Sequence, residues 1–238
     1  MKKYLSYIMM LVKSSWVAFA SLIGGLTVFN FIIFSQKLSK ELPFEQIIET
    51  SGNLYVVGIF AIVLLMYLYR RYAEKRKRGM LLPISGTEIV LSRVIYGSGW
   101  SIILTLMFVS SLFVQSRIYI AEMPEKFVTN QIFALAMMNT EFGRFIFNSA
   151  FLSYVLAFLT VASFIALVSI DKYAVSSISN FKIILLYVML ILILFISSGA
   201  YIKLYGSMFF AHIPIVIVIL LILNIDVFAI RIGGAKDL

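Results

Sequence analysis

The stretch IILLYVMLILILFISSGAYI, residues 183–202, contains no Asp, Glu, Lys or Arg. A helix needs about 20 mostly apolar residues to cross the roughly 30 Å hydrocarbon core of a bilayer, because each residue advances it by about 1.5 Å. Residues 183–202 have this length and composition. They therefore predict a transmembrane helix.

Five further uncharged runs approach or reach the same length. The six predicted spans are residues 16–34, 54–69, 94–114, 145–170, 183–202 and 208–225. The second run is the shortest and the fourth the longest, so we expect helix tilt there, or an interfacial turn at one end. The chain is predicted to be all-α, a polytopic membrane protein with one transmembrane domain over residues 1–238.

The composition supports a membrane protein and excludes several classes of site. Of the 238 residues, 62% are hydrophobic and 13% charged, whereas about a quarter of a typical soluble domain is charged. The chain has no cysteine and a single histidine, His212, which excludes disulfides, thiolate metal sites and histidine clusters. The spans offer no paired carboxylates, so we do not expect an enzyme.

The distribution of basic residues predicts the orientation. Cytoplasmic loops of membrane proteins retain an excess of Lys and Arg. If the N-terminus is inside, the inner segments hold most of the basic residues, including the run from Lys75 to Arg78. Glutamates balance the basic residues of the outer segments, so both termini are predicted to be cytoplasmic. The net charge of +9 does not indicate nucleic acid, because the basic residues lie between apolar runs.

Two regions outside the spans contain apolar patterns. Residues 1–15 place Leu5, Ile8, Met9 and Val12 at helical spacing, which predicts an interfacial helix before the first span. The predicted outer loop, residues 115–144, contains the apolar stretch 132–138, which is too short to cross a membrane. That stretch is either a helix in the outer interface or a re-entrant turn.

The inner loop between the second and third predicted spans carries the most local information. After the basic run, Pro83 stops any continuing helix, and Ser85 and Glu88 have the spacing of a capping box. Ile84 and Ile89 occupy the positions of a hydrophobic staple. The loop therefore predicts a short, separately capped helix that starts at Ser85, just before the third span. The basic run also favours the inner leaflet, where it contacts anionic lipid.

On these residues the sequence resembles the ABC-2 type permeases, the membrane subunits of a class of ATP-binding-cassette exporters. In that family six helices follow an amphipathic N-terminal helix, so the resemblance covers nearly the whole chain. The chain departs from many members after the fifth span, where only Lys203–Ser207 separate the last two spans. The positions that match the family's inner loop are Glu74, Arg76, Arg78, Gly79, Leu82, Pro83, Ile84, Ser85, Glu88 and Arg93.

The resemblance implies that residues 74–93 form a cytoplasmic coupling loop and helix that sits in a groove of a separate ATPase subunit. The residues it assigns to this coupling are Glu74, Arg76, Arg78, Leu82, Pro83, Ile84, Ser85, Thr87, Glu88 and Leu91. It also implies a second permease subunit, in a homodimer or a heterodimer, and a location in the bacterial cytoplasmic membrane. The small size and short loops look like permeases that export peptides such as bacteriocins or cytolytic peptides, although drug and lipid exporters belong to the same family.

The sequence has no G-x-x-x-x-G-K-[ST] phosphate loop. We therefore expect no cofactor in this chain, and expect ATP and Mg²⁺ to bind the partner subunit. The largely uncharged spans favour a hydrophobic or amphipathic substrate. The alternative function is that of a stand-alone membrane immunity or interaction protein, which binds a toxin in the bilayer and acts without an ATPase.

A few polar residues interrupt the apolar runs. They either hydrogen-bond between helices, which we favour, or line a pathway. These residues are Asn30, Thr105, Asn148, Tyr154 and Ser163. His212 lies near the outer end of the sixth predicted span, where we expect it to be an interfacial polar residue. Asp226 lies at the inner end of that span, where we expect it to pair with an inner-leaflet cation or a helix end.

Overall fold

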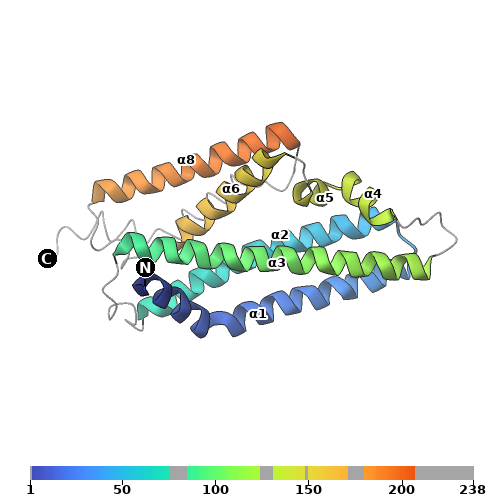
Figure 1. The fold of residues 1–238 in the computed structure, drawn as a ribbon, viewed down its shortest axis with the longest axis horizontal. Coiled ribbons are helices and arrows are strands. Elements are labelled where there is room, and N and C mark those ends of the chain that lie inside the picture. Colours follow the sequence, from blue (N-terminus) through green and yellow to red (C-terminus); the bar gives the residue numbers. More distant parts are fainter. Residues whose placement is uncertain (1, 76–84, 124–130, 148–149, 171–179, 207–238) are drawn as a thin grey trace. The chain divides into compact units, whose positions relative to one another are not determined.

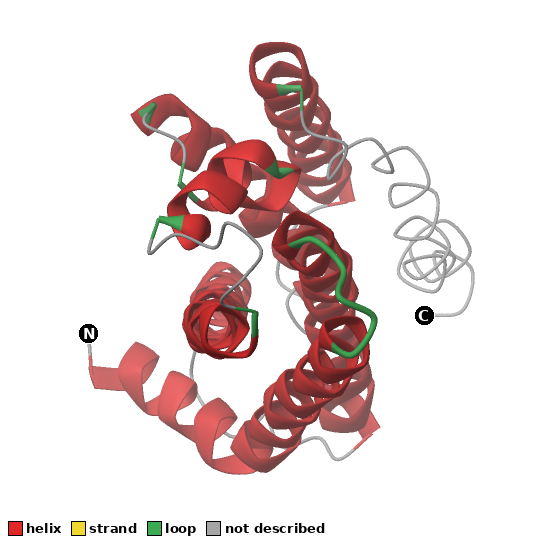
Figure 2. Ribbon diagram, turned by 90° about the vertical axis from the view of Figure 1, so that its right-hand side faces the viewer, coloured by secondary structure: helices red, strands yellow, loops and turns green. Residues whose placement is uncertain are grey.

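The structure, a computed structural model, describes residues 2–75, 85–123, 131–147, 150–170 and 180–206. Over these ranges every regular element is a helix (Figures 1 and 2). In chain order they are α1 (Lys2–Leu38), α2 (Phe44–Lys75), α3 (Gly86–Glu122), α4 (Ile132–Asn139), α5 (Glu141–Ile146), α6 (Phe151–Ser169) and α8 (Asn180–Tyr205). The prediction of an all-helical chain is confirmed for these residues.

Five of these helices are long and apolar enough to cross a membrane. The candidate spans are Leu5–Leu38, Phe44–Tyr69, Gly86–Glu122, Phe151–Ser169 and Lys182–Tyr205. Between 22% and 44% of the apolar window of each span is buried inside the protein. Large apolar side chains such as Val28, Leu106 and Ile196 are more than half exposed, which suits a hydrocarbon solvent and not water. The sixth predicted span, residues 208–225, lies outside the described residues.

The helices extend beyond the uncharged runs from which we predicted them. One continuous helix, α1, covers both the predicted interfacial helix over residues 1–15 and the first predicted span. α2 begins at Phe44, ahead of the predicted start at Leu54, and contains Glu45 and Glu49. α3 continues to Glu122, so Gln115 and Tyr119, predicted to lie in the outer loop, are helical and buried. A charged residue ends an apolar run without ending a helix, because ionic side chains have good helix propensity.

The fourth predicted span, residues 145–170, is not one helix. α5 ends at Ile146, and α6 begins at Phe151. The amide of Phe147 donates to the carbonyl of Gly143 at 2.8 Å, which closes the last turn of α5. The Tyr154 hydroxyl donates to the carbonyl of Ile146 at 2.9 Å. The predicted span therefore divides into the end of α5 and a candidate spanning helix of 19 residues, Phe151–Ser169.

The apolar stretch 132–138 forms most of α4, and α5 follows it directly after a turn at Thr140. The Thr140 hydroxyl accepts a hydrogen bond from the Gly143 amide at 3.2 Å and thereby caps α5. The Arg144 Nε atom donates to the carbonyl of Met138 at 3.1 Å, near the end of α4. Gly143 lies directly against the main-chain carbonyl of Met137, where no other side chain has room. Backbone contact and two side-chain hydrogen bonds therefore fix the turn between α4 and α5.

The chain divides into two compact units. The first comprises Met1–Trp16, Val63–Gly99 and Val155–Leu238, and the second Val17–Ile62 and Trp100–Tyr154. In the second unit the Tyr55 ring packs against Phe108, Phe142 and Phe145, with ring centroids 5.2–6.2 Å apart. In the first unit the Thr160 and Ser197 hydroxyls lie 2.8 Å apart and join α6 to α8. Buried aromatic packing thus stabilises the second unit internally, and a contact between small hydroxyl side chains does so in the first.

Candidate functional site

The first turn of α3 is held by side chains of its own sequence. The Ser85 amide donates to Glu88 Oε2 at 2.9 Å, and the Glu88 amide lies 3.4 Å from Ser85 Oγ. The Ser85 hydroxyl lies 3.0 Å from Glu88 Oε2 and 3.1 Å from the Thr87 hydroxyl. This is the predicted capping box, and it places a carboxylate at a helix N-terminus, where the helix dipole favours negative charge. Ile84, the predicted staple residue, lies outside the described residues.

The first two turns of α3 have one exposed and one buried side. Ser85, Thr87 and Glu88 are exposed, and Leu91 is 54% exposed. Gly86, Ile89 and Ser92 are buried. We call the exposed side, made by Ser85, Thr87, Glu88 and Leu91, the cap surface. It presents two hydroxyls, one carboxylate and one large apolar side chain.

Arg93, two residues after Leu91 of the cap surface, anchors the beginning of α3. The Arg93 side chain is 8% exposed, and its Nη1 atom donates to the main-chain carbonyl of Ser169 at 2.8 Å. Ser169 is the last residue of α6. The final carbonyls of a helix have no partner within the helix and carry partial negative charge, so a buried guanidinium is a favourable cap for them. Arg93 thus joins the start of α3 to the end of α6.

The same turn of α3 also contacts α1 and α2. The Tyr96 hydroxyl shares a hydrogen bond with the Ser15 hydroxyl, and both side chains are buried. At Gly97 a Cβ atom would lie 2.9 Å from Ile165 Cγ2 and 3.2 Å from Met66 Cε, so α2 and α6 approach α3 closely. Residues 93, 96 and 97 therefore fix the base of the cap surface to three other helices of this unit.

The structure corrects the prediction of a short helix separate from the third span. The helix that begins after Ser85 continues without a break to Glu122. The region has no proline after Pro83 until Pro124, and the glycines at 97 and 99 lie inside the helix, where close packing at Gly97 favours the small residue. The cap surface is therefore the end of a candidate membrane-spanning helix, and a displacement of its first turn acts directly on that helix.

The other residues predicted to couple to an ATPase are less completely described. Glu74 lies in the last turn of α2, which ends at Lys75. The remaining members lie outside the described residues, and these are Arg76, Arg78, Leu82, Pro83 and Ile84. The structure thus brings together four of the predicted residues, Ser85, Thr87, Glu88 and Leu91, on the cap surface.

Two of the polar residues predicted within the spans make hydrogen bonds between helices. Asn30 is 1% exposed; its Nδ2 atom donates to Ser111 Oγ at 3.1 Å, and its Oδ1 atom accepts from the Ser51 hydroxyl at 2.7 Å. The Thr105 and Tyr55 hydroxyls lie 3.0 Å apart. Asn30 therefore joins α1 to α2 and α3, and Thr105 joins α3 to α2.

The other three polar residues that we predicted within the spans are not part of these hydrogen bonds of Asn30 and Thr105. Tyr154 is exposed and bonds to the end of α5, Ser163 is buried in α6, and Asn148 lies outside the described residues. Gln115, which the sequence did not single out, is fully buried, and neither of its amide atoms has a hydrogen-bond partner in the part of the chain that the structure describes. Gln115 comes directly after the uncharged run 94–114 and was therefore assigned to the outer loop. Nothing in the apolar run itself indicated that the next residue is buried.

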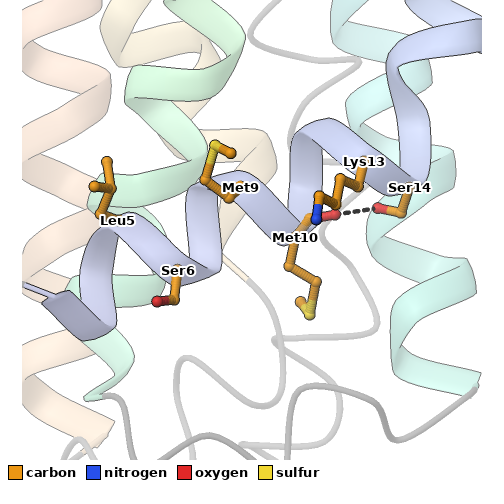
Figure 3. A pocket seen from close by; sticks show the side chains of 6 residues that line it. All are labelled: Leu5, Ser6, Met9, Met10, Lys13 and Ser14. Carbon is orange, nitrogen blue, oxygen red and sulfur yellow. Dashed lines mark hydrogen bonds between the residues drawn. The ribbon is translucent and has the colours of Figure 1, made fainter.

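A groove of about 550 Å³ runs along the beginning of α1 (Figure 3). The described residues that line it are Leu5, Ser6, Met9, Met10, Lys13 and Ser14. Across the described ranges, no three His, Asp or Glu side chains come together as metal ligands would. Among the described residues of the first unit, the cap surface and this groove are two features that could receive another molecule.

Comparison with known proteins gives no relative: no protein-family model, no curated protein and no solved structure matches this chain.

Proposed function

We propose that this chain is the permease subunit of an ATP-driven exporter of the ABC-2 type, in the bacterial cytoplasmic membrane. The observation that carries the proposal is the cap surface: an exposed, capped helix end that belongs to a candidate membrane span. A cytoplasmic motor needs a structure of this kind to move a membrane helix. Coupling to an ATPase is also the role that the resemblance to ABC-2 type permeases implies for these residues.

The mounting of the cap surface supports this role. A flexible loop would absorb a push from a partner, whereas the turn at Arg93, Tyr96 and Gly97 is bonded and packed against α1, α2 and α6. Displacement of the cap surface would therefore move several helices together. Packed interfaces of this kind change between discrete arrangements and do not deform gradually.

The cap surface also has the chemistry of a docking site. Leu91 supplies an apolar contact, and Thr87 and Glu88 supply polar ones. Interfaces commonly bury a few apolar anchors within a polar rim. ATP and Mg²⁺ would bind to the partner chain, since this sequence has no phosphate loop.

The apolar spans support a hydrophobic or amphipathic substrate, such as a bacteriocin-like or cytolytic peptide, a drug or a lipid. The described spans contain little charge at depth, whereas ion-coupled transporters keep ionisable residues there. We propose that two permease subunits, identical or different, enclose the pathway.

Leu91→Asp tests the proposed contact. We expect this variant to lower the ATPase activity that co-purifies with the tagged chain in mild detergent by about tenfold or more, the loss that corresponds to about 1.4 kcal/mol of binding free energy. The matched control is Leu204→Asp. Leu204 is 56% exposed, close to the 54% of Leu91. It lies in the last turn of α8, and this end of the helix is predicted to be on the outer side of the membrane.

The control variant should retain its ATPase. Equal recovery of ATPase activity with both variants, at equal amounts of inserted chain, would contradict the proposal. If the chain instead protects liposomes or cells from a toxin in the absence of any ATPase, the alternative function, a stand-alone immunity protein, would be supported.

A further inference from the structure

Three phenylalanine rings of the second unit form a row on its surface. The Phe113 ring of α3 meets the Phe133 ring of α4 edge to face, with the ring centroids 5.7 Å apart. The Phe133 ring meets the Phe147 ring, just after α5, in the same manner at 6.4 Å. Phe113 and Phe147 are 48% and 54% exposed. We call these three residues the aromatic row, and its contacts join side chains from three parts of the chain into one apolar surface.

An exposed cation lies at one end of the aromatic row. The Arg117 Cζ atom is 5.3 Å from the centre of the Phe113 ring, so the ring attracts the guanidinium through its negative face. Arg117 is exposed and forms no ion pair with any residue that the structure describes. Glu122, the next acidic residue along α3, is five positions further on and therefore lies on a different side of the helix. The N–H groups of Arg117 are thus available to an anion.

The order of these residues along α3 matches the order of the parts of a lipid. Phe113 belongs to the uncharged run 94–114, and Arg117 comes three residues after the end of that run. Four residues of helix place the cation about 6 Å further along the axis than the ring, on the side where the uncharged run has ended. Phe147 also belongs to an uncharged run, residues 145–170. The charge therefore lies at the level of the head groups and the exposed rings at the level of the hydrocarbon.

We propose that Arg117 and the aromatic row bind an anionic phospholipid, with the phosphate at the Arg117 guanidinium and an acyl chain along the three rings. The planar fork of a guanidinium can donate two parallel hydrogen bonds to phosphate oxygens. Rings that are exposed at the level of the hydrocarbon meet acyl chains, and the cation beside them is complementary to an anionic head group. This proposal goes beyond export, since it requires a membrane protein but neither a cargo nor an ATPase.

A tryptophan in the aromatic row provides the test. Trp16→Phe and Trp100→Phe remove both native tryptophans, and Phe147→Trp then supplies a single fluorophore at an exposed aromatic position. The protein is reconstituted into phosphatidylcholine vesicles that contain phosphatidylglycerol or phosphatidylcholine with brominated acyl chains, at equal mole fractions. Bromine quenches tryptophan only at close range, so quenching reports an acyl chain at the row. We expect a preference of about fivefold for brominated phosphatidylglycerol, the effect of one basic residue near the surface.

Substitutions in the same background separate a defined site from general attraction to the surface. Arg117→Gln should abolish the preference for phosphatidylglycerol, and Arg117→Lys should retain most of it, since lysine keeps the charge. The matched control is Lys203→Gln, which removes another exposed cation, in the last turn of α8, and should leave the preference unchanged.

Three results would overturn the proposal. Equal quenching by the two brominated lipids would show that the row contacts lipid without selecting it. Quenching by neither lipid would show that protein, such as a second copy of the chain, covers the row. An equal loss of preference in Arg117→Gln and Lys203→Gln would show that the total charge of the protein, and no defined site, attracts the lipid.

Discussion

Replacement of Gly143 by alanine is expected to lower the free energy of unfolding by about 3 kcal/mol or more, since overpacking against atoms that cannot move is among the most destabilising changes. A Cβ atom at this position would overlap the main-chain carbonyl of Met137 in α4. A flexible side chain could rotate away from such a contact, but the backbone at the end of a helix cannot. The turn between α4 and α5 would have to open.

The opening would spread because α5 carries part of the aromatic packing of its unit. Phe142 and Phe145 place their rings 5.2 and 6.2 Å from the ring of Tyr55 in α2. Phe142 is 1% exposed, so its displacement would uncover a large apolar surface. Titration with SDS in mixed micelles, followed by circular dichroism, measures the change in stability.

Gly199→Ala is the matched control. Gly199 lies inside α8, and a Cβ atom there would meet nothing within 4 Å. Because alanine favours a helix by up to about 1 kcal/mol over glycine, this variant should be as stable as the parent chain or slightly more stable. If the two alanine variants unfold alike, Gly143 does not lie against the Met137 carbonyl.

Replacement of Arg93 by alanine should destabilise the first unit by about 3 kcal/mol, because it removes a charge-assisted hydrogen bond and leaves a buried acceptor without its donor. The acceptor is the main-chain carbonyl of Ser169, a residue that is 2% exposed and is the last one of α6. The methylene groups of Arg93 also contribute packing that alanine does not replace.

The same SDS titration measures this effect against a second arginine of the same helix. Arg117 is exposed, and its guanidinium lies 5.3 Å from the centre of the Phe113 ring, so Arg117→Ala should cost less than about 1 kcal/mol. Arg93→Lys should restore part of the stability, since it keeps a donor and a charge. A loss in Arg93→Ala as small as that in Arg117→Ala would show that the bond to α6 does not hold α3.

The features that could be predicted from the sequence are those that depend on neighbouring residues. Runs without charge identified the five candidate spanning helices in the described residues, because lipid excludes ionic side chains over a fixed thickness. The capping box was also predictable, since Ser85 and Glu88 are three residues apart and bond within one turn. Both signals need no knowledge of the rest of the fold.

The features that the sequence did not reveal depend on contacts between distant segments. Arg93 was counted as a basic residue of an inner loop, yet its partner is Ser169, 76 positions away. The close approach of Met137 to Gly143 depends on the turn between α4 and α5, and the break before Phe151 falls in a stretch without proline or glycine.

The same division applies to the candidate site. The cap surface contains residues that the family resemblance singles out, but the reason it could transmit force is the packing around residues 93, 96 and 97, which no local pattern encodes. Asn30 and Thr105 were predictable as polar interruptions of apolar runs. Their bonds to Ser111, Ser51 and Tyr55 required the structure.

The central claim is that a separate ATPase docks on the cap surface from the cytoplasm. Because the chain contains no cysteine, Thr87→Cys places a single thiol on this surface, where Thr87 is exposed. The thiol is treated in intact cells and in inside-out vesicles with a membrane-impermeant, cleavable cross-linker. We predict reaction in the inside-out vesicles alone, with a cross-link to a chain that hydrolyses ATP. Reaction from outside intact cells, or a thiol that reacts in the vesicles without capturing any ATPase, would contradict the account.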